Sequence, residues 1–119
     1  MQSKYFNDDD FKCRCGCGMD VSQKLKEKVF AMREDAHVPF IVTSGARCES
    51  HNAKVGGKQN SSHTRGLAVD IAYGSSGAAF AIEKAAYQHG IKRIGRNRTK
   101  KFIHIDIDDS LPQNVSFDY

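Results

Sequence analysis

Two short segments of the 119-residue chain carry histidine and aspartate against an apolar background. His63 and Asp70 occur in SSHTRGLAVDI, and His104 and Asp106 occur in FIHIDI. Imidazole nitrogens and carboxylate oxygens are the ligands that zinc accepts in catalytic sites, where three protein groups leave a fourth position open. A single histidine in a strand is ordinarily a hydrogen-bonded core or surface residue. Two such segments in one chain nevertheless favour a metal site.

Both segments alternate as strands with one apolar face, because successive strand side chains point to opposite faces. The apolar faces are predicted to consist of Leu67, Val69 and Ile71 in the first segment and of Ile103, Ile105 and Ile107 in the second. The other faces carry Asp70, His104 and Asp106. Gly66 and Ala68 are small, so we expect that face to leave room for a ligand.

The elements that must position these residues can be predicted from the rest of the pattern. A first helix is capped by Asp20 with Gln23 at the third position, and extends to about Ala36. A second helix begins at Ser75 or Ser76 and is stopped by Gly90. The remaining predictions are strands at 40–43, 67–72, 91–94 and 102–107, an extended arm at 1–12, mostly loop at 49–62, a basic turn at 95–101 and an irregular tail from 112.

This irregular alternation of helices and short strands predicts an α+β fold, a single small domain over residues 1–119 with one antiparallel sheet and flanking helices. A hydrophobic content of 39% and a charged content of 27% are ordinary for a globular protein. We find no apolar run of membrane-spanning length and no leader, so neither a membrane span nor a signal peptide is expected. The net charge of +4 suits an anionic polymer without being diagnostic.

The same motifs resemble a known family. SSHTRGLAVDI fits the S-x-H-x-x-G-x-A-x-D signature of the zinc D-Ala-D-Ala peptidases, the peptidase M15 or hedgehog-type family. FIVTSGARCESHN is similar to that family's strand ending in Ser-Gly-x-Arg, GGKQNSSH to its loop before the first ligand, and FIHIDI to its last-ligand strand. The resemblance extends from about Phe11 to Asp109. It implies a hedgehog or DD-peptidase-like fold, in a phage or bacterial member of the family.

The resemblance implies that His63 and Asp70 are the first two ligands of a Zn²⁺ ion. The third ligand comes from His104 or Asp106, and we favour His104 because two histidines with one carboxylate are a common hydrolytic set. Asp106 would then be the catalytic base or would support His104 from behind. Several relatives carry the base three residues before the last histidine, where this chain has Lys101. In relatives with His-x-His the second histidine is the ligand, which would make Asp106 the ligand and His104 the base.

Two further site residues are carried over from the resemblance. Arg47 is expected to act in catalysis and substrate binding, since a guanidinium can hold a carboxylate or carbonyl oxygen; its alternative is an ion pair with Glu49. Ser61 either binds substrate or caps the loop. Glu49 and His51 are the next candidates for the base if Asp106 is not.

Four cysteines remain: Cys13, Cys15 and Cys17 in CRCGC, and Cys48 after Arg47. They could form a structural zinc site, although the spacing is not the usual C-x₂-C knuckle. A disulfide to Cys48 or reduced buried thiols are the alternatives. FKCRCGCG also resembles the N-terminal stretch of phage and bacterial members of the family, which implies a structural role.

The resemblance implies a zinc-dependent peptidase that cleaves peptide stems or cross-links of bacterial peptidoglycan, as a D-Ala-type carboxypeptidase or an endolysin-like endopeptidase. A monomer made in the cytoplasm would reach the cell wall by lysis, in a phage particle or by another export route. The alternative is a non-catalytic zinc domain that binds cell wall or a protein partner. A nucleic-acid module built on the cysteines is not expected, because only Lys12 and Arg14 lie among them.

Overall fold

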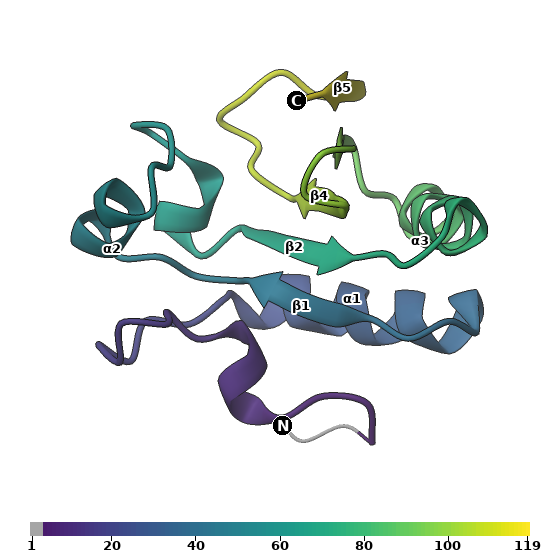
Figure 1. Cartoon of the computed structure of the whole chain (residues 1–119), viewed down its shortest axis with the longest axis horizontal. Coiled ribbons are helices and arrows are strands. Elements are labelled where there is room, and N and C mark those ends of the chain that lie inside the picture. The colour runs from purple at the N-terminus through teal and green to yellow at the C-terminus, as the bar shows by residue number, and fades with distance from the viewer. Residues whose placement is uncertain (1–3) are drawn as a thin grey trace.

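Five strands form one sheet in the order β1-β2-β4-β3-β5, in a computed structural model that describes residues 4–119 (Figure 1). The strands are β1 (Ile41–Ser44), β2 (Ala68–Ala72), β3 (Arg93–Asn97), β4 (Phe102–Asp106) and β5 (Val115–Asp118). The pairs β1–β2, β2–β4 and β3–β4 are antiparallel, whereas β5 is parallel to β3. The α+β fold is confirmed, but the sheet is mixed rather than wholly antiparallel. The tail beyond Pro112, predicted to be irregular, supplies the parallel strand.

Helix α1 (Gln23–Ala36) occupies the predicted place but has a different cap. Ser22 Oγ accepts a hydrogen bond from the backbone N–H of Leu25 at 3.3 Å, so Ser22 is the N-cap. The predicted cap, Asp20, is wrong, because its carboxylate accepts from Val21 N–H and pairs with Lys26 at 2.6 Å.

Helix α3 (Ser76–Gln88) confirms its prediction: Ser75 caps it, and Gly90 follows it with a φ of 75°. Helix α1 packs against α3, α3 packs against β4, and both helices contribute buried side chains to one core with the sheet. The buried side chains of this core include Leu25, Val29 and Met32 from α1, Ala79, Ile82, Ala85 and Ala86 from α3, and Val69, Ile71, Ile103 and Ile105 from the sheet. The opposite face of β2 and β4 is left for polar residues.

Several segments expected to be irregular are helical. Residues 49–62, predicted as mostly loop, contain α2 (Glu49–Lys54) and the first residue of the 3₁₀ helix η2 (Ser62–Arg65). The arm predicted to be extended contains the 3₁₀ helix η1 (Asp8–Phe11), and Phe6 and Phe11 are buried in the core. Residues 1–3 of that arm lie outside the described part of the chain. No helix within residues 4–119 is both long and apolar enough to cross a membrane.

Candidate metal centre

The two faces of β2 and β4 separate apolar from polar side chains as their alternation predicts. Val69 and Ile71 on β2 are fully buried in the core. Asp70, between them, is directly paired across the two strands with His104 on β4. Ala68 is likewise paired with Asp106. The antiparallel register therefore sets a carboxylate beside an imidazole on the face that points away from the helices.

Helix η2 brings His63 to this face from outside the sheet. Ser61 caps the helix, with its Oγ accepting from His63 N–H at 3.2 Å, a contact that favours the capping role for this serine. Gly66 ends it with a φ of 70°. A Cβ at Gly66 would lie 2.8 Å from Asp20 O, so this glycine permits a tight turn against the chain entering α1 rather than leaving room for a ligand.

His63, Asp70 and His104 form a compact group whose ligand atoms lie within 4.8 Å of one another. Asp70 Oδ1 lies 3.3 Å from His63 Nε2 and 3.0 Å from His104 Nδ1. Only 2–6% of each residue's surface is exposed. The group is therefore arranged around one carboxylate oxygen and is almost fully shielded from solvent.

The ring of His63 is oriented by a backbone carbonyl. Its Nδ1 lies 2.7 Å from Gly45 O, which can only accept, so Nδ1 carries the proton and donates. In the neutral ring Nε2 then has a free lone pair. This buried Nε2 makes no hydrogen bond within residues 4–119, and it lies 3.3 Å from Asp70 Oδ1. A buried nitrogen with a free lone pair can serve as a ligand for a metal cation.

The ring of His104 is oriented by Asp106. The Nε2 of His104 lies 2.7 Å from Asp106 Oδ2, an acceptor when ionised, so Nε2 donates and Nδ1 faces Asp70. The other oxygen, Asp106 Oδ1, accepts from Arg93 Nε at 2.8 Å and from Asp108 N–H at 3.1 Å. Asp106 is only 1% exposed. A carboxylate behind a histidine in this way fixes the tautomer that binds a metal.

The electrostatics of the group favour a positive charge at its centre. Burial alone would raise the pKa of Asp70, but its contacts with His104 and His63 lower that pKa to about 2. Burial would lower the pKa of His104, yet its hydrogen bonds with Asp106 and Asp70 outweigh burial and raise it. The raised pKa favours a proton on His104 Nδ1 beside Asp70, which a zinc ion would replace; two ring nitrogens and one ionised carboxylate oxygen would then form a donor set suited to zinc.

The sequence model of the family described as Peptidase M15 matches residues 4–106, most of the chain. The chain belongs to the peptidase M15 family. A comparison with curated proteins found no match. The match to the family model confirms the resemblance seen in the sequence motifs. M15 peptidases are typically zinc-dependent, and the group formed by His63, Asp70 and His104 fits that ion, so family and structure together support a zinc metallopeptidase.

In this M15 family member, Arg47 lies beside the metal-competent group, which consists of His63, Asp70 and His104. Its Nη2 is 3.8 Å from Asp70 Oδ2, and its Nη1 donates to Asn52 Oδ1 at 3.0 Å. Its partners are thus Asn52 and Asp70 rather than Glu49. The buried Nε of Arg47 has no hydrogen-bond partner among the described residues. Gly57 is required here, because a Cβ on it would lie 2.0 Å from Asn52 Oδ1 and 2.7 Å from Arg47 Nη1.

Asp108 is a site-supporting residue of the M15 domain that the sequence motifs did not reveal. Its Oδ2 accepts from Ser62 Oγ at 2.9 Å and from Arg65 Nε at 2.8 Å, so it ties η2 to the end of β4. Burial would raise the pKa of Asp108, but hydrogen bonds from Ser110, Arg65 and Ser62 lower it to about 2. These contacts hold the helix that presents His63.

Two aromatic rings, one from β5 and one from the residue that follows it, lie against the group formed by His63, Asp70 and His104. The ring of His104 is 5.7 Å from that of Phe117 and 6.4 Å from that of Tyr119, centroid to centroid. A Cβ at Gly95, the partner of His104 on β3, would lie 2.3 Å from the Phe117 ring. The sequence motifs gave no signal for this aromatic wall, which depends on the pairing of β5 with β3.

The candidates for the catalytic base lie at different places around the group formed by His63, Asp70 and His104. Several relatives carry an acid at the position of Lys101, but this residue is a lysine and cannot act as the base. It lies in the exposed turn before β4, with a φ of 58°. Glu49 and His51 are on α2, which connects to the group through Arg47 and Asn52. Asp70 is the one carboxylate in the metal-competent group found within residues 4–119.

Proposed function

We propose that this M15 family member is a zinc peptidase that cleaves peptide bonds in the stems or cross-links of bacterial peptidoglycan, acting as a monomer. His63 Nε2, Asp70 Oδ1 and His104 Nδ1 are the proposed ligands. The observation that carries the proposal is the convergence of these three ligand atoms, one of them a buried nitrogen with no hydrogen-bond partner in the described part of the chain. Zinc would supply Lewis-acid polarisation of the scissile carbonyl and a lowered pKa for a nearby water.

The ligand set is kept in the binding tautomers by two acceptors behind the rings. Gly45 O holds the proton of His63 on Nδ1, and Asp106 holds the proton of His104 on Nε2. Neither ring can turn without leaving its acceptor unpaired in a buried environment. The chain therefore maintains the donor geometry itself, which supports catalysis by a preorganised site.

Arg47 is the proposed substrate-binding residue. Its side chain is 13% exposed, its Nη2 lies 3.8 Å from Asp70 Oδ2, and its Nε has no hydrogen-bond partner among the described residues. A peptidoglycan stem offers both carboxylates and peptide carbonyls, and a guanidinium binds either through paired N–H donors. The net charge of +4 also suits approach to an anionic wall polymer.

For Asp106, the contacts favour positioning of His104 over direct proton abstraction. Both carboxylate oxygens are already engaged, by His104 on one side and by Arg93 and Asp108 on the other. The hydrogen bond to His104 uses Nε2, whereas Nδ1 is the nitrogen that faces Asp70. We therefore propose that Asp106 acts through His104 and does not contact the reacting water.

The second candidate function is a non-catalytic zinc domain that binds cell wall or a protein partner. The observation in its favour is the exposed Lys101 at the position of the usual acid, together with the full engagement of Asp106. Such a domain would bind zinc through the same three residues and would leave peptide bonds intact.

Hydrolysis of purified peptidoglycan separates the two functions. Zinc-loaded protein should release cleaved peptides, detected by mass spectrometry, and chelated protein should not until it is reloaded with zinc. The masses identify the bond: D-Ala from a stem, a resolved cross-link, or a cut between L-Ala and D-Glu. Binding to the wall by fully loaded protein with no released peptide would contradict the peptidase and favour the binding domain.

A further inference from the structure

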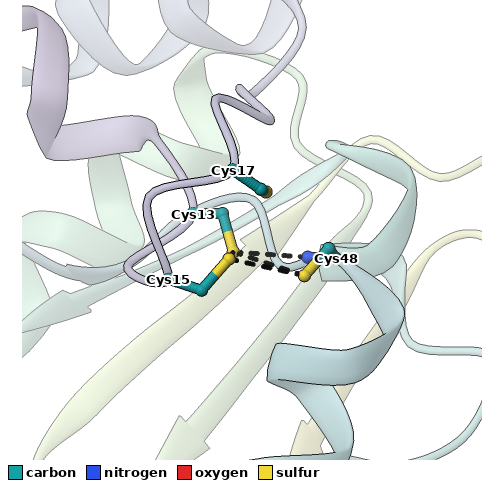
Figure 2. A group of neighbouring side chains, drawn as sticks. All are labelled: Cys13, Cys15, Cys17 and Cys48. Atoms are coloured by element: carbon teal, nitrogen blue, oxygen red, sulfur yellow. Dashed lines mark hydrogen bonds between the residues drawn. The ribbon is translucent and has the colours of Figure 1, made fainter.

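A second group of metal-type ligands lies apart from the histidines. Cys13, Cys15 and Cys17 come from the loop before α1, and Cys48 comes from the residue that precedes α2 (Figure 2). The four Sγ atoms all lie within 4.8 Å of one another. None of them is in a disulfide. Two segments far apart in the sequence thus deliver every cysteine of the chain to one point.

The sulfur separations fit a shared metal ion. Cys13 Sγ lies 3.4 Å from Cys15 Sγ and 3.9 Å from Cys48 Sγ, and Cys15 Sγ lies 3.6 Å from Cys48 Sγ. A tetrahedral zinc ion with Zn–S bonds of about 2.3 Å places its sulfurs about 3.8 Å apart. A disulfide would require about 2.05 Å between two sulfurs, well below each of these three separations.

The CRCGCG sequence produces this convergence through its glycines. Gly16 and Gly18 have φ values of 86° and 89°, which side-chain-bearing residues rarely adopt. Gly16 N–H donates to Cys13 O at 3.2 Å, and Cys13 N–H donates to Met19 O at 2.8 Å, so the loop closes on itself. Alternate residues of an extended segment would be too far apart, and the turn brings all three thiols to one side.

Backbone N–H groups also point at the sulfurs. Cys48 N–H donates to Cys13 Sγ at 3.4 Å, and His51 N–H donates to Cys48 Sγ at 3.5 Å. Donors of this kind stabilise the thiolate form, which is the form that binds metal. They are contributed by the start of α2, so the segment that bears Cys48 is itself shaped around the cluster.

We propose that Cys13, Cys15, Cys17 and Cys48 hold a structural zinc ion, separate from the ion at His63, Asp70 and His104. Binding would displace the remaining thiol protons to solvent, with no change of oxidation state. Four thiolates fill the coordination sphere, so this ion would have no open position for a substrate.

The proposed ion would fix the connector between β1 and α2. On one side of that connector Ala46 N–H donates to Phe11 O at 3.0 Å, next to the cysteine loop. On the other, Gly45 O binds His63 Nδ1 at 2.7 Å and Arg47 N–H donates to His63 O at 3.0 Å. The cysteine site would therefore stabilise the segment that orients both His63 and Arg47.

Metal content of the His63→Ala protein tests the proposal independently of activity. The wild-type chain should hold two zinc ions and His63→Ala should retain one. X-ray absorption of the retained zinc should show sulfur neighbours at about 2.3 Å. Cobalt in its place should give thiolate-to-metal charge-transfer absorption, which can come only from this group because the chain has four cysteines in all.

Cysteine variants supply the matched comparison. Cys17→Ser, at an exposed position, should lose one zinc equivalent while the ion at the histidines remains. Ser50→Ala should lose none, although its hydroxyl lies 3.8 Å from Cys48 Sγ. The proposal is overturned if wild-type protein holds one zinc with four freely reactive thiols, or if protein alkylated on isolation carries a disulfide. If a variant does not fold, the cobalt spectrum of the wild-type protein decides.

Discussion

His104 Nδ1 lies 3.0 Å from Asp70 Oδ1, and these two residues are directly paired across β4 and β2. The register of two antiparallel strands thus determines the distance between two of the three proposed ligands. The third, His63, arrives on a 3₁₀ helix held by Ser61 and Asp108. Changes to the residues around this pair have distinct expected effects on zinc and on hydrolysis.

Arg47→Ala should retain zinc and the fold but lose about 2–4 kcal/mol of transition-state stabilisation, because it removes one preorganised donor. Arg47→Lys keeps the charge without the paired N–H donors and should recover only part of that loss. The measurement is kcat/KM on a peptidoglycan peptide, with zinc content determined on the same samples. Full activity in Arg47→Ala would make this arginine a structural residue.

Asp106→Asn separates positioning from base catalysis. If Asp106 acts by holding the proton of His104 on Nε2, the affinity for zinc should fall about 10–100-fold, as when other such partners are changed. If it is the base, zinc affinity should be unchanged and kcat should fall about 10²–10⁴-fold. Zinc titration and turnover measured together on this variant distinguish the roles, and loss of the ion at all zinc concentrations would make Asp106 a ligand.

Gly57→Ala should lower activity by disturbing Arg47, the proposed substrate-binding residue, and should leave zinc binding unchanged. The new Cβ would stand 2.0 Å from Asn52 Oδ1 and would displace the partner of Arg47. Misplacement by about 1 Å can cost about 100-fold in rate, so a loss up to that size is expected with normal zinc content. Gly74→Ala is the control, since a Cβ there has no neighbour within 4 Å. Equal activities of the two variants would refute the role of Gly57.

Asp108→Asn should weaken the fold in a pH-dependent manner. The folded-state pKa of about 2 lies below the ordinary 3.8, so the ionised carboxylate stabilises the fold above about pH 4 and loses this effect as the pH falls through 2. At pH 7 the variant should lose about 1–3 kcal/mol of unfolding free energy, because Arg65 and Ser62 lose a charged acceptor. Denaturant titrations from pH 7 to pH 2 measure this difference, and a difference that stays constant would exclude ionisation as its cause.

Sequence alternation was sufficient to predict which face of each strand carries Asp70 and His104, because a strand has a side-chain period of two. It also located β2 and β4 to within one residue at each end. Periodicity was not enough to predict β5, because four residues are too few for the alternation of Val115 and Phe117 with Ser116 and Asp118 to stand out; the strand depends on its parallel pairing with β3. Helix α2 was missed because its six residues are too few to show an apolar period.

The contacts that orient the side chains of the site could not be predicted from sequence patterns, for a different reason. Gly45 contributes a backbone oxygen to His63, and the backbone carries no sequence signal. Asp108 and Arg93 act through tertiary contacts with η2 and with Asp106. The motif therefore predicts the proposed ligands, whereas their tautomers and the engagement of Asp106 follow only from the folded arrangement.

Anomalous diffraction at the zinc edge, from crystals of zinc-loaded protein, tests the proposed ligand set. This ligand set predicts a peak within about 2.0–2.2 Å of His63 Nε2, a carboxylate oxygen of Asp70 and His104 Nδ1. Asp106 should remain bonded to His104 Nε2 and stay out of the coordination sphere. A fully loaded crystal with no peak between these three residues, or with Asp106 bound to the ion in place of His104, would contradict it.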